Sequence, residues 1–187
     1  MKAIFIQYKP FFLFLGRFLL VYLSLLLVYK IYLNRFDFVQ NEPDSMTVLV
    51  AEQSNGLMNF FGYESRIEPN PSEPSINLYH GPNNYYVRVI EGCNAVSVMI
   101  LFAAFCFAFS AYFLRTLIYV LIGFVLIHFL NVFRIALIVV LSIKYPQWYT
   151  ALHDIVFPLF IYGVVFILWC LWLFKFSGYA EKFLTKK

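Results

Sequence analysis

Four long apolar stretches most constrain what this chain can fold into. A helix of about 20 apolar residues is needed to cross the hydrocarbon core of a bilayer, which is about 30 Å thick. The chain of 187 residues is 62% hydrophobic and 13% charged, whereas a soluble domain is about half apolar and about a quarter charged. We therefore expect an all-α multipass membrane bundle. Its transmembrane helices are expected at about residues 11–33, 95–114, 117–143 and 155–176.

The first apolar stretch shares one feature with signal peptides, because Lys2 and Lys9 precede it. The run from Phe11 to Leu33 is longer than a typical signal-peptide core. No small-x-small cleavage site follows it. We interpret it as an uncleaved first transmembrane helix.

One polar segment, residues 34–92, separates the first two apolar stretches. The other connections are short, with residues 115–116 between the second and third stretches and 144–151 between the third and fourth. The second and third helices are therefore expected to form a tight hairpin. The chain is predicted to be a single membrane domain, 1–187, in which the polar segment is an insertion outside the bilayer.

The distribution of charge predicts the side of the membrane that the polar segment occupies. This segment carries more acidic than basic residues, while lysine and arginine gather at the opposite ends of the helices. Those basic residues are Lys2, Lys9, Arg115, Lys175, Lys182, Lys186 and Lys187. The positive-inside rule places them in the cytoplasm. Both termini are thus expected inside and residues 34–92 outside the cytoplasmic membrane.

The extracytoplasmic segment has signals of its own secondary structure. A helix is expected over residues 46–61, capped by Asp44 or Ser45. Residues 68–74 are rich in proline, which lacks an amide hydrogen, so a loop is expected there. A small β-hairpin is predicted over residues 76–90, with β-prone strands on either side of a Gly-Pro-Asn-Asn turn.

The three cysteines differ in their surroundings. Cys106 and Cys170 lie inside apolar runs and are interpreted as packing residues. Cys93 lies at the outer start of the second membrane helix, followed by Asn94. A helix N-terminus presents free N–H groups and a positive dipole end, which favour the reactive thiolate. No Cys-x-x-Cys pair or Cys/His ligand spacing occurs in the sequence, so no metal site is predicted.

Arg134 is the most informative polar residue of the apolar stretches, because polar groups inside a bilayer are costly. It lies about nine residues, or ~14 Å, before the outer end of the third helix. Asn131 lies one turn earlier on nearly the same face and is predicted to orient Arg134. His128 lies one turn earlier again.

His153 lies near the start of the fourth helix, at the outer interface. Thr150 and Asp154 are candidate N-caps there, and Asp154 is also positioned to orient the imidazole. Because successive helices run in opposite directions, Cys93, Arg134 and His153 are all expected at the outer face. A thiol, a guanidinium and an imidazole are the parts of a cysteine acyl-transfer site.

These residues alone leave other interpretations open. Cys93 could be structural, and Arg134 could pack against neighbours or bind a lipid headgroup. His128 and His153 could ligate haem in a redox protein, although their expected depths in the membrane differ. A non-enzymatic assembly factor of a cell-envelope system is a further alternative. The sequence has no basic patch with interleaved aromatic residues, which argues against nucleic-acid binding.

The order of these residues resembles the exosortase/archaeosortase family. The shared features are Glu-Gly-Cys93-Asn-Ala at a helix start, Asn131-x-x-Arg134 within the next helix, and His153 opening the last. The resemblance covers about residues 85–160. It implies a membrane cysteine transpeptidase in which Cys93, Arg134 and His153 are catalytic. The chain departs from many members in having Asn-Ala rather than Ser-Gly after the cysteine, and in having fewer helices, as in short exosortase-F-type proteins.

The resemblance also implies a class of substrate and a location. The substrate would be a protein with a C-terminal transmembrane helix and a basic cytoplasmic tail, cut just outside the bacterial cytoplasmic (inner) membrane through a thioester on Cys93. Asn131, Asp154 and Asn94 would support the catalytic residues, and no cofactor is expected. The predicted external helix and hairpin are candidate docking surfaces for the substrate.

Overall fold

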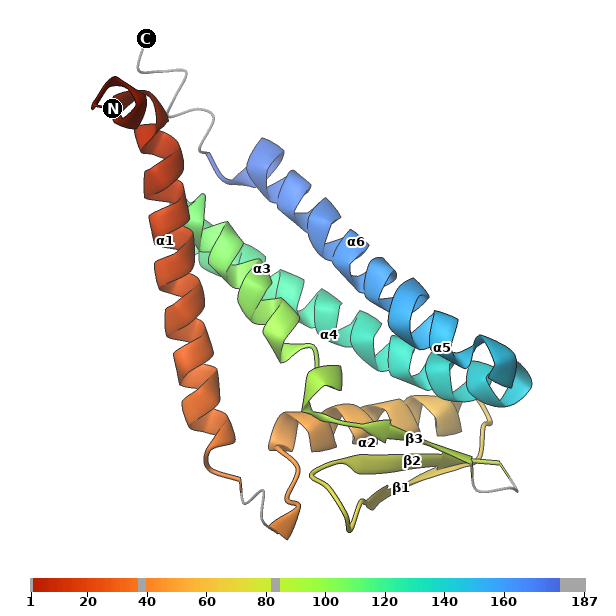
Figure 1. Ribbon diagram of the computed structural model, residues 1–187. Helices are drawn as coiled ribbons and strands as arrows, with labels where there is room; N and C mark the ends of the chain where they lie inside the picture. The colour runs from red at the N-terminus through yellow and green to blue at the C-terminus, as the bar shows by residue number, and fades with distance from the viewer. Residues whose placement is uncertain (1, 37–39, 82–84, 179–187) are drawn as a thin grey trace. The chain divides into compact units, whose positions relative to one another are not determined.

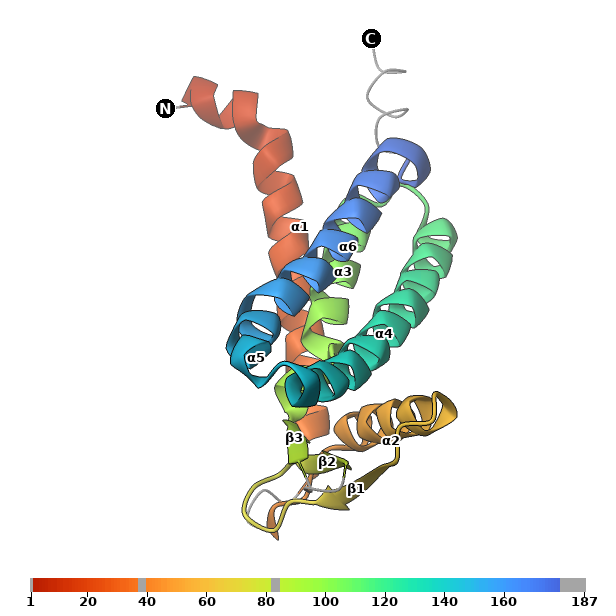
Figure 2. The same cartoon turned by 90° about the vertical axis from the view of Figure 1, so that its right-hand side faces the viewer.

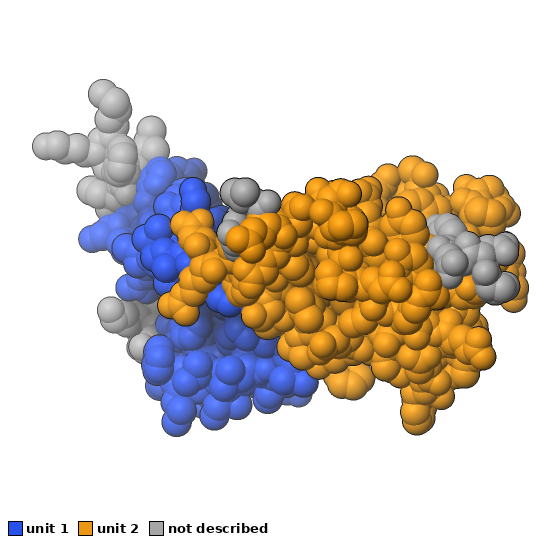
Figure 3. All heavy atoms as spheres, turned by 90° about the horizontal axis from the view of Figure 1, so that it is seen from below, with its two compact units in different colours: residues 1–32, 97–125, 165–187 blue, residues 33–96, 126–164 orange. Residues whose placement is uncertain are grey.

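The computed structural model describes residues 2–36, 40–81 and 85–178. The chain forms two compact units from segments that alternate along the sequence (Figure 3). The first, which we call the helical unit, comprises residues 1–32, 97–125 and 165–187. The second, the sheet unit, comprises residues 33–96 and 126–164. Each unit is described by itself.

Within the described residues, three helical runs are long and apolar enough to cross a membrane (Figure 1). They are Phe11–Leu33 within α1 (Lys2–Leu33), all of α4 (Phe113–Lys144), and Pro146–Phe176. The third run is a succession of turns and helices, among them α5 (Tyr149–Ala151), the π-helical turn η4 (Leu152–Val156) and α6 (Phe157–Leu171). Together with the small sheet described below, these helices confirm the predicted helical membrane bundle with a β insertion.

The turn between α3 (Val96–Ala108) and α4 lies earlier in the chain than the predicted Arg115-Thr116 connection. Thr116 instead lies in the first turn of α4. Its Oγ1 donates to the Tyr112 carbonyl (2.9 Å) and forms a hydrogen bond with the Ser110 hydroxyl (2.6 Å). Hydroxyls that bond nearby backbone carbonyls can be accommodated within an apolar helix, so the sequence pattern misplaced the break.

Aromatic rings fill the helical unit. Phe14 of α1 stacks on Phe109 at 4.1 Å between ring centroids, and Phe105 of α3 stacks on Trp169 of α6 at 4.5 Å. Offset and edge contacts of this kind add about 0.5–1.5 kcal/mol per pair to the burial of the rings. Their packing explains why so many phenylalanines lie in the apolar runs.

In the sheet unit, α2 (Ser45–Phe60) forms where the sequence predicts a helix. Asp44 is the N-cap, and its Oδ1 accepts hydrogen bonds from the amides of Met46 (3.0 Å) and Thr47 (3.1 Å). A cap of this type stabilises a helix by about 1 kcal/mol. The burial of the Asp44 carboxylate, which is 3% exposed, shows that this helix end faces the interior.

The sheet has three antiparallel strands in the order β1-β2-β3. The predicted hairpin corresponds to β2 (Ile76–His80) and β3 (Tyr85–Val89), and β1 (Ser65–Pro69) was not predicted. β1 takes in the start of the segment that was expected to be a loop. Proline is tolerated at its end because β1 is an edge strand, so the proline-rich sequence hid a strand.

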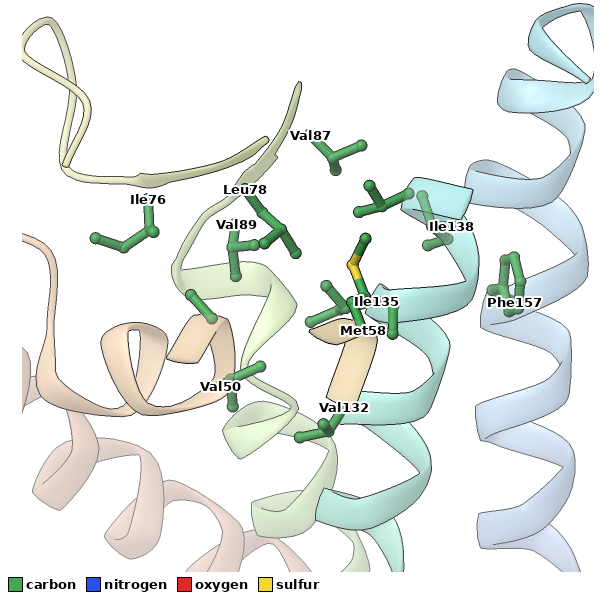
Figure 4. Packing of buried hydrophobic residues seen from close by; sticks show 13 residues of the cluster. Val50, Met58, Ile76, Leu78, Val87, Val89, Val132, Ile135, Ile138 and Phe157 are labelled. Carbon is green, nitrogen blue, oxygen red and sulfur yellow. The ribbon is translucent and has the colours of Figure 1, made fainter. Parts of the chain in front are cut away.

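A hydrophobic core joins the sheet, α2 and the second half of α4 (Figure 4). Figure 2 shows α2 beside the sheet and below α4. Figure 4 shows the inward side chains of the strands directed at those of the two helices. The buried members include Val50, Met58, Leu78, Val87, Val89, Val132, Ile135 and Ile138. Burying one such side chain contributes about 1.5–3 kcal/mol. The polar segment is therefore a folded layer that shares its core with α4.

Candidate active site

Cys93 lies in the short link between the sheet and α3. The link is a 3-10 turn, η2 (Glu91–Cys93), and the amide of Cys93 donates to the Ile90 carbonyl (2.8 Å). Ala95 then adopts a left-handed φ of 63°, and α3 begins at Val96. The thiol is partly exposed. Cys93 therefore precedes the first residue of α3 by three positions, close to the helix start where the sequence placed it.

Asn94 fixes the backbone just after the cysteine. Its Oδ1 accepts from the amide of Val96 (2.9 Å), which caps α3. Its Nδ2 donates to Thr47 Oγ1 (3.4 Å) and lies 3.5 Å from Asp44 Oδ1, at the N-terminus of α2. Asn94 is 1% exposed. A buried amide with these hydrogen bonds fixes the start of α2, the start of α3 and the cysteine turn relative to one another.

Asn131 holds the cysteine from the other side. Its Nδ2 donates to the carbonyl of Cys93 (2.7 Å), and the side chain is fully buried. The sequence predicted instead that Asn131 orients Arg134. Its Oδ1 is buried and has no hydrogen-bond partner within the described residues. The structure thus makes Asn131 a direct support for the backbone of Cys93.

Arg134 lies next to the folded layer that α2 and the sheet form. α2 packs on α4 just before it: His128 Nε2 forms a hydrogen bond with Gln53 Oε1 (2.6 Å), and Ser54 Oγ lies 3.4 Å from the Val132 carbonyl. The Nε of Arg134 is buried, and it makes no hydrogen bond in the part of the chain that the structure describes. An unpaired buried donor is costly, so this guanidinium is available to an incoming acceptor.

His153 lies in the π-helical turn η4. Such turns are rare and occur frequently at functional sites. The imidazole stacks on Tyr149 at 5.6 Å between centroids, and its Nδ1 is 2.7 Å from Asp154 Oδ1. A carboxylate at Nδ1 favours the tautomer with hydrogen on that atom, which leaves Nε2 as a base.

The expectation that Asp154 or Thr150 caps the last helix is wrong. The helical run begins at Pro146, and α5 has Trp148 as its N-cap. Asp154 therefore lies inside the run, where its carboxylate is free to hold His153. Because this helical run starts earlier than predicted, Asp154 lies inside it and bonds His153 instead of capping the helix.

Cys93, Arg134 and His153 line one small pocket of the sheet unit. These residues come from the cysteine turn, from α4 and from η4. The remaining lining is Val87, Arg88, Val89, Ile135 and Ile138. A thiol, a guanidinium and an imidazole thus share one cavity with four apolar side chains and Arg88. Asn131, Asn94 and Asp154 do not line the cavity, and each bonds a lining residue or the backbone beside it.

His128 does not join this group, since its imidazole pairs with Gln53. Within the described residues, no group of three or more His, Cys, Asp or Glu side chains is placed to hold a metal ion.

Two contributors to the candidate site were not predicted from the sequence. Tyr149 lies four residues before His153, a spacing that places both on one helix face, and the last residues of β3 line the pocket.

A family model described as transmembrane exosortase matches residues 5–175 of the chain. The protein belongs to the transmembrane exosortase family. No curated protein and no solved structure matches this exosortase. Family membership and the three apolar helices establish a membrane protein, and membership supports a general role as a membrane transpeptidase.

Proposed function

We propose that this exosortase is a membrane-embedded cysteine transpeptidase that cleaves C-terminal sorting signals of exported proteins. One observation carries the proposal: Cys93, Arg134 and His153 line the same pocket. These are the side chains that the family resemblance selects, and they come from three separate elements. The family match supports transpeptidation in general, and the pocket supports these three residues as its catalytic groups.

The reaction begins with transfer of the Cys93 proton to Nε2 of His153. The thiolate attacks the scissile carbonyl, and the Arg134 guanidinium stabilises the oxyanion that forms. The carbon–nitrogen bond then breaks, and His153 returns its proton to the leaving amine. The N-terminal part of the substrate remains on Cys93 as a thioester. An acceptor nucleophile gives its proton to His153, forms the new acyl bond and releases the thiol.

Three other residues keep these groups in place. Asp154 bonds Nδ1 of His153 (2.7 Å) and stabilises the imidazolium that forms during attack. Asn131 fixes the carbonyl of Cys93 (2.7 Å), and Asn94 caps the helix that follows it. Because they touch the catalytic residues rather than the substrate, they act as positioning residues.

The substrate in this proposal is a protein with a C-terminal transmembrane helix and a basic cytoplasmic tail. The sheet unit lies on the extracytoplasmic side of the bacterial cytoplasmic membrane, as the positive-inside rule expects. The cut then falls just outside the membrane, between the exported domain and its anchor. The anchor and tail leave, and the exported domain passes to the acceptor.

Substitution of the candidate nucleophile tests the function. In cells that carry the protein, we expect Cys93→Ala and Cys93→Ser to remain in the membrane while tail-bearing precursors accumulate. Mass spectrometry of the C-termini of exported proteins measures this. Cys106→Ala is the matched control, since that thiol is fully buried in α3, and it should leave processing unchanged. If the Cys93→Ala strain has the same processed C-termini as cells with the unsubstituted protein, the proposal is refuted and a non-enzymatic assembly factor is favoured.

A further inference from the structure

β3 is an edge strand of the sheet. It pairs with β2 from His80 opposite Tyr85 to Ile76 opposite Val89. In the part of the chain that the structure describes, the order β1-β2-β3 leaves its other side without a strand. Among the described residues, no backbone hydrogen bond joins residues 86–89 to any segment other than β2. An edge strand presents a row of backbone N–H and C=O groups to whatever lies beside it.

The small pocket with Cys93 reaches this free edge. Val87, Arg88 and Val89 are consecutive, and all three line the pocket. Successive side chains of a strand point to opposite faces of the sheet, and here the two valines are buried while Arg88 is exposed. A pocket that touches all three therefore meets the strand at the backbone edge that they share.

We propose that the substrate binds as an added fourth strand along β3. Its main chain pairs with the free edge at residues 86–89, and its scissile carbonyl then lies at Cys93 Sγ, a few residues further along the chain. This inference rests on the proposed function, because it names how the same site holds its peptide. β-Strand addition is a common mode of peptide recognition, in which main-chain hydrogen bonds supply affinity.

The walls of the pocket favour an extended peptide over other occupants. A main chain that leaves water needs hydrogen-bond partners for its N–H and C=O groups, and the β3 edge supplies them. A helical segment bonds its own backbone, and a lipid chain has no such groups, so neither would use the edge. The opposite wall offers the apolar Ile135 and Ile138, beside Arg134 and His153.

This arrangement predicts the kind of specificity that the enzyme has. Main-chain pairing tolerates many sequences, whereas pockets for alternate side chains select among them. Every second substrate residue next to the cut faces Ile135 and Ile138. We expect apolar side chains at those alternate positions and tolerance of other residues between them.

A peptide that reacts with the thiol tests the added strand. The probe is an acetylated Ala-Val-Ala-Val-Ala peptide that ends in a vinyl sulfone. Cys93 Sγ adds to the terminal vinyl carbon, the electron pair moves to the carbon beside the sulfone, and that carbon takes a proton from His153. The enzyme is the full-length chain in detergent, with Cys106→Ala and Cys170→Ala so that Cys93 is the only thiol. Intact mass measures the labelling rate, and Cys93→Ala is the blank.

The parent peptide is compared with versions that carry a single N-methyl group at each successive residue. Only alternate amides of an added strand point at β3, so methylation should slow labelling about tenfold at every second residue and little between them. About 1.4 kcal/mol corresponds to that factor. After labelling by the parent peptide, hydrogen–deuterium exchange should slow in residues 85–90. β1, the other edge of the same sheet, is the internal control and should not change.

The outcomes separate this inference from the proposed function. Equal labelling by all the methylated peptides would overturn the added strand, even if Cys93→Ala stops processing in cells. Failure of every peptide to label Cys93, while iodoacetamide alkylates it, would overturn the added strand too. An alternating pattern together with normal processing in Cys93→Ala cells would instead leave the peptide site standing and remove the enzymatic role.

Discussion

At the scale of single residues, the bond between Asp154 and His153 can be tested separately from the catalytic groups. Asp154→Asn keeps an oxygen for Nδ1 of His153 but removes the charge that stabilises the imidazolium. Hydrogen bonds to charged groups contribute about 1.5–3 kcal/mol, so labelling of Cys93 by the vinyl sulfone peptide should slow by about 10- to 100-fold. Thr150→Ala, an exposed change in the same helical run, is the control. An unchanged rate in Asp154→Asn would show that Asp154 does not act through His153.

Substitution of Asn131 should change both the stability of the protein and the reactivity of Cys93. Asn131→Leu removes the donor that bonds the Cys93 carbonyl and leaves that acceptor buried. The expected cost is about 1–3 kcal/mol of unfolding free energy, measured by thermal unfolding in detergent. Labelling of Cys93 by the peptide probe should slow as well, because the cysteine turn loses its support.

A matched change on the same helix separates these two effects. The hydroxyl of Ser142 is buried in α4, and its hydrogen-bond partner among the described residues is the Ile138 carbonyl of its own helix. Ser142→Ala should therefore change neither the labelling rate nor, by more than a few tenths of a kcal/mol, the stability. Equal behaviour of Asn131→Leu and Ser142→Ala would contradict the assigned role of Asn131.

At the scale of elements, Gly123 allows α3 and α4 to approach closely within the helical unit. A Cβ at this position would collide with the ring of Phe102. Small residues at membrane helix contacts permit such an approach. Gly123→Ala should cost about 1–3 kcal/mol through overpacking, measured by thermal unfolding in detergent.

Two further variants check that the clash is the cause. Gly163 in α6 has no atom within 4 Å of an added Cβ, so Gly163→Ala should not destabilise the protein. Phe102→Leu should restore part of the stability lost in Gly123→Ala, because the smaller side chain leaves room. Additive losses in the double variant would mean that the ring and the new methyl group do not meet.

The sequence predicted elements best where one physical signal dominated. The length of the apolar stretches predicted the long helices, and the capping residue Asp44 predicted the start of α2. β1 was missed because its proline lies at the end of an edge strand, which tolerates it. The π-helical turn at His153 was missed because no residue pattern distinguishes it from an α-helix. Asp154 was consequently predicted both as a candidate cap and as a residue that orients His153, and only the second role agrees with its place inside the helical run.

At the scale of the whole molecule, the alternating direction of successive helices was enough to predict that the candidate site residues lie on one side of the membrane. Helix direction could not supply the pocket, since that depends on contacts between residues distant in sequence. Asn131 and Cys93 are 38 positions apart, yet their bond fixes the cysteine turn. The surroundings of Arg134 could not be predicted for the same reason, because α2 and the sheet share a core with α4 through contacts between residues distant in sequence.

The length of α4 predicts which of its residues are accessible from outside the membrane. Its 32 residues extend about 48 Å at the helical rise, which exceeds a hydrocarbon core of about 30 Å, so its C-terminal end should project outside. In a variant without native cysteines, we expect Ile143→Cys to react with a membrane-impermeant maleimide in intact cells. Ile122→Cys, which is 63% exposed on the same helix, should resist because lipid covers it. Arg115→Cys should react only after permeabilisation. Reaction of Arg115→Cys but not Ile143→Cys in intact cells would reverse the orientation and put the pocket in the cytoplasm, where no exported substrate could reach Cys93.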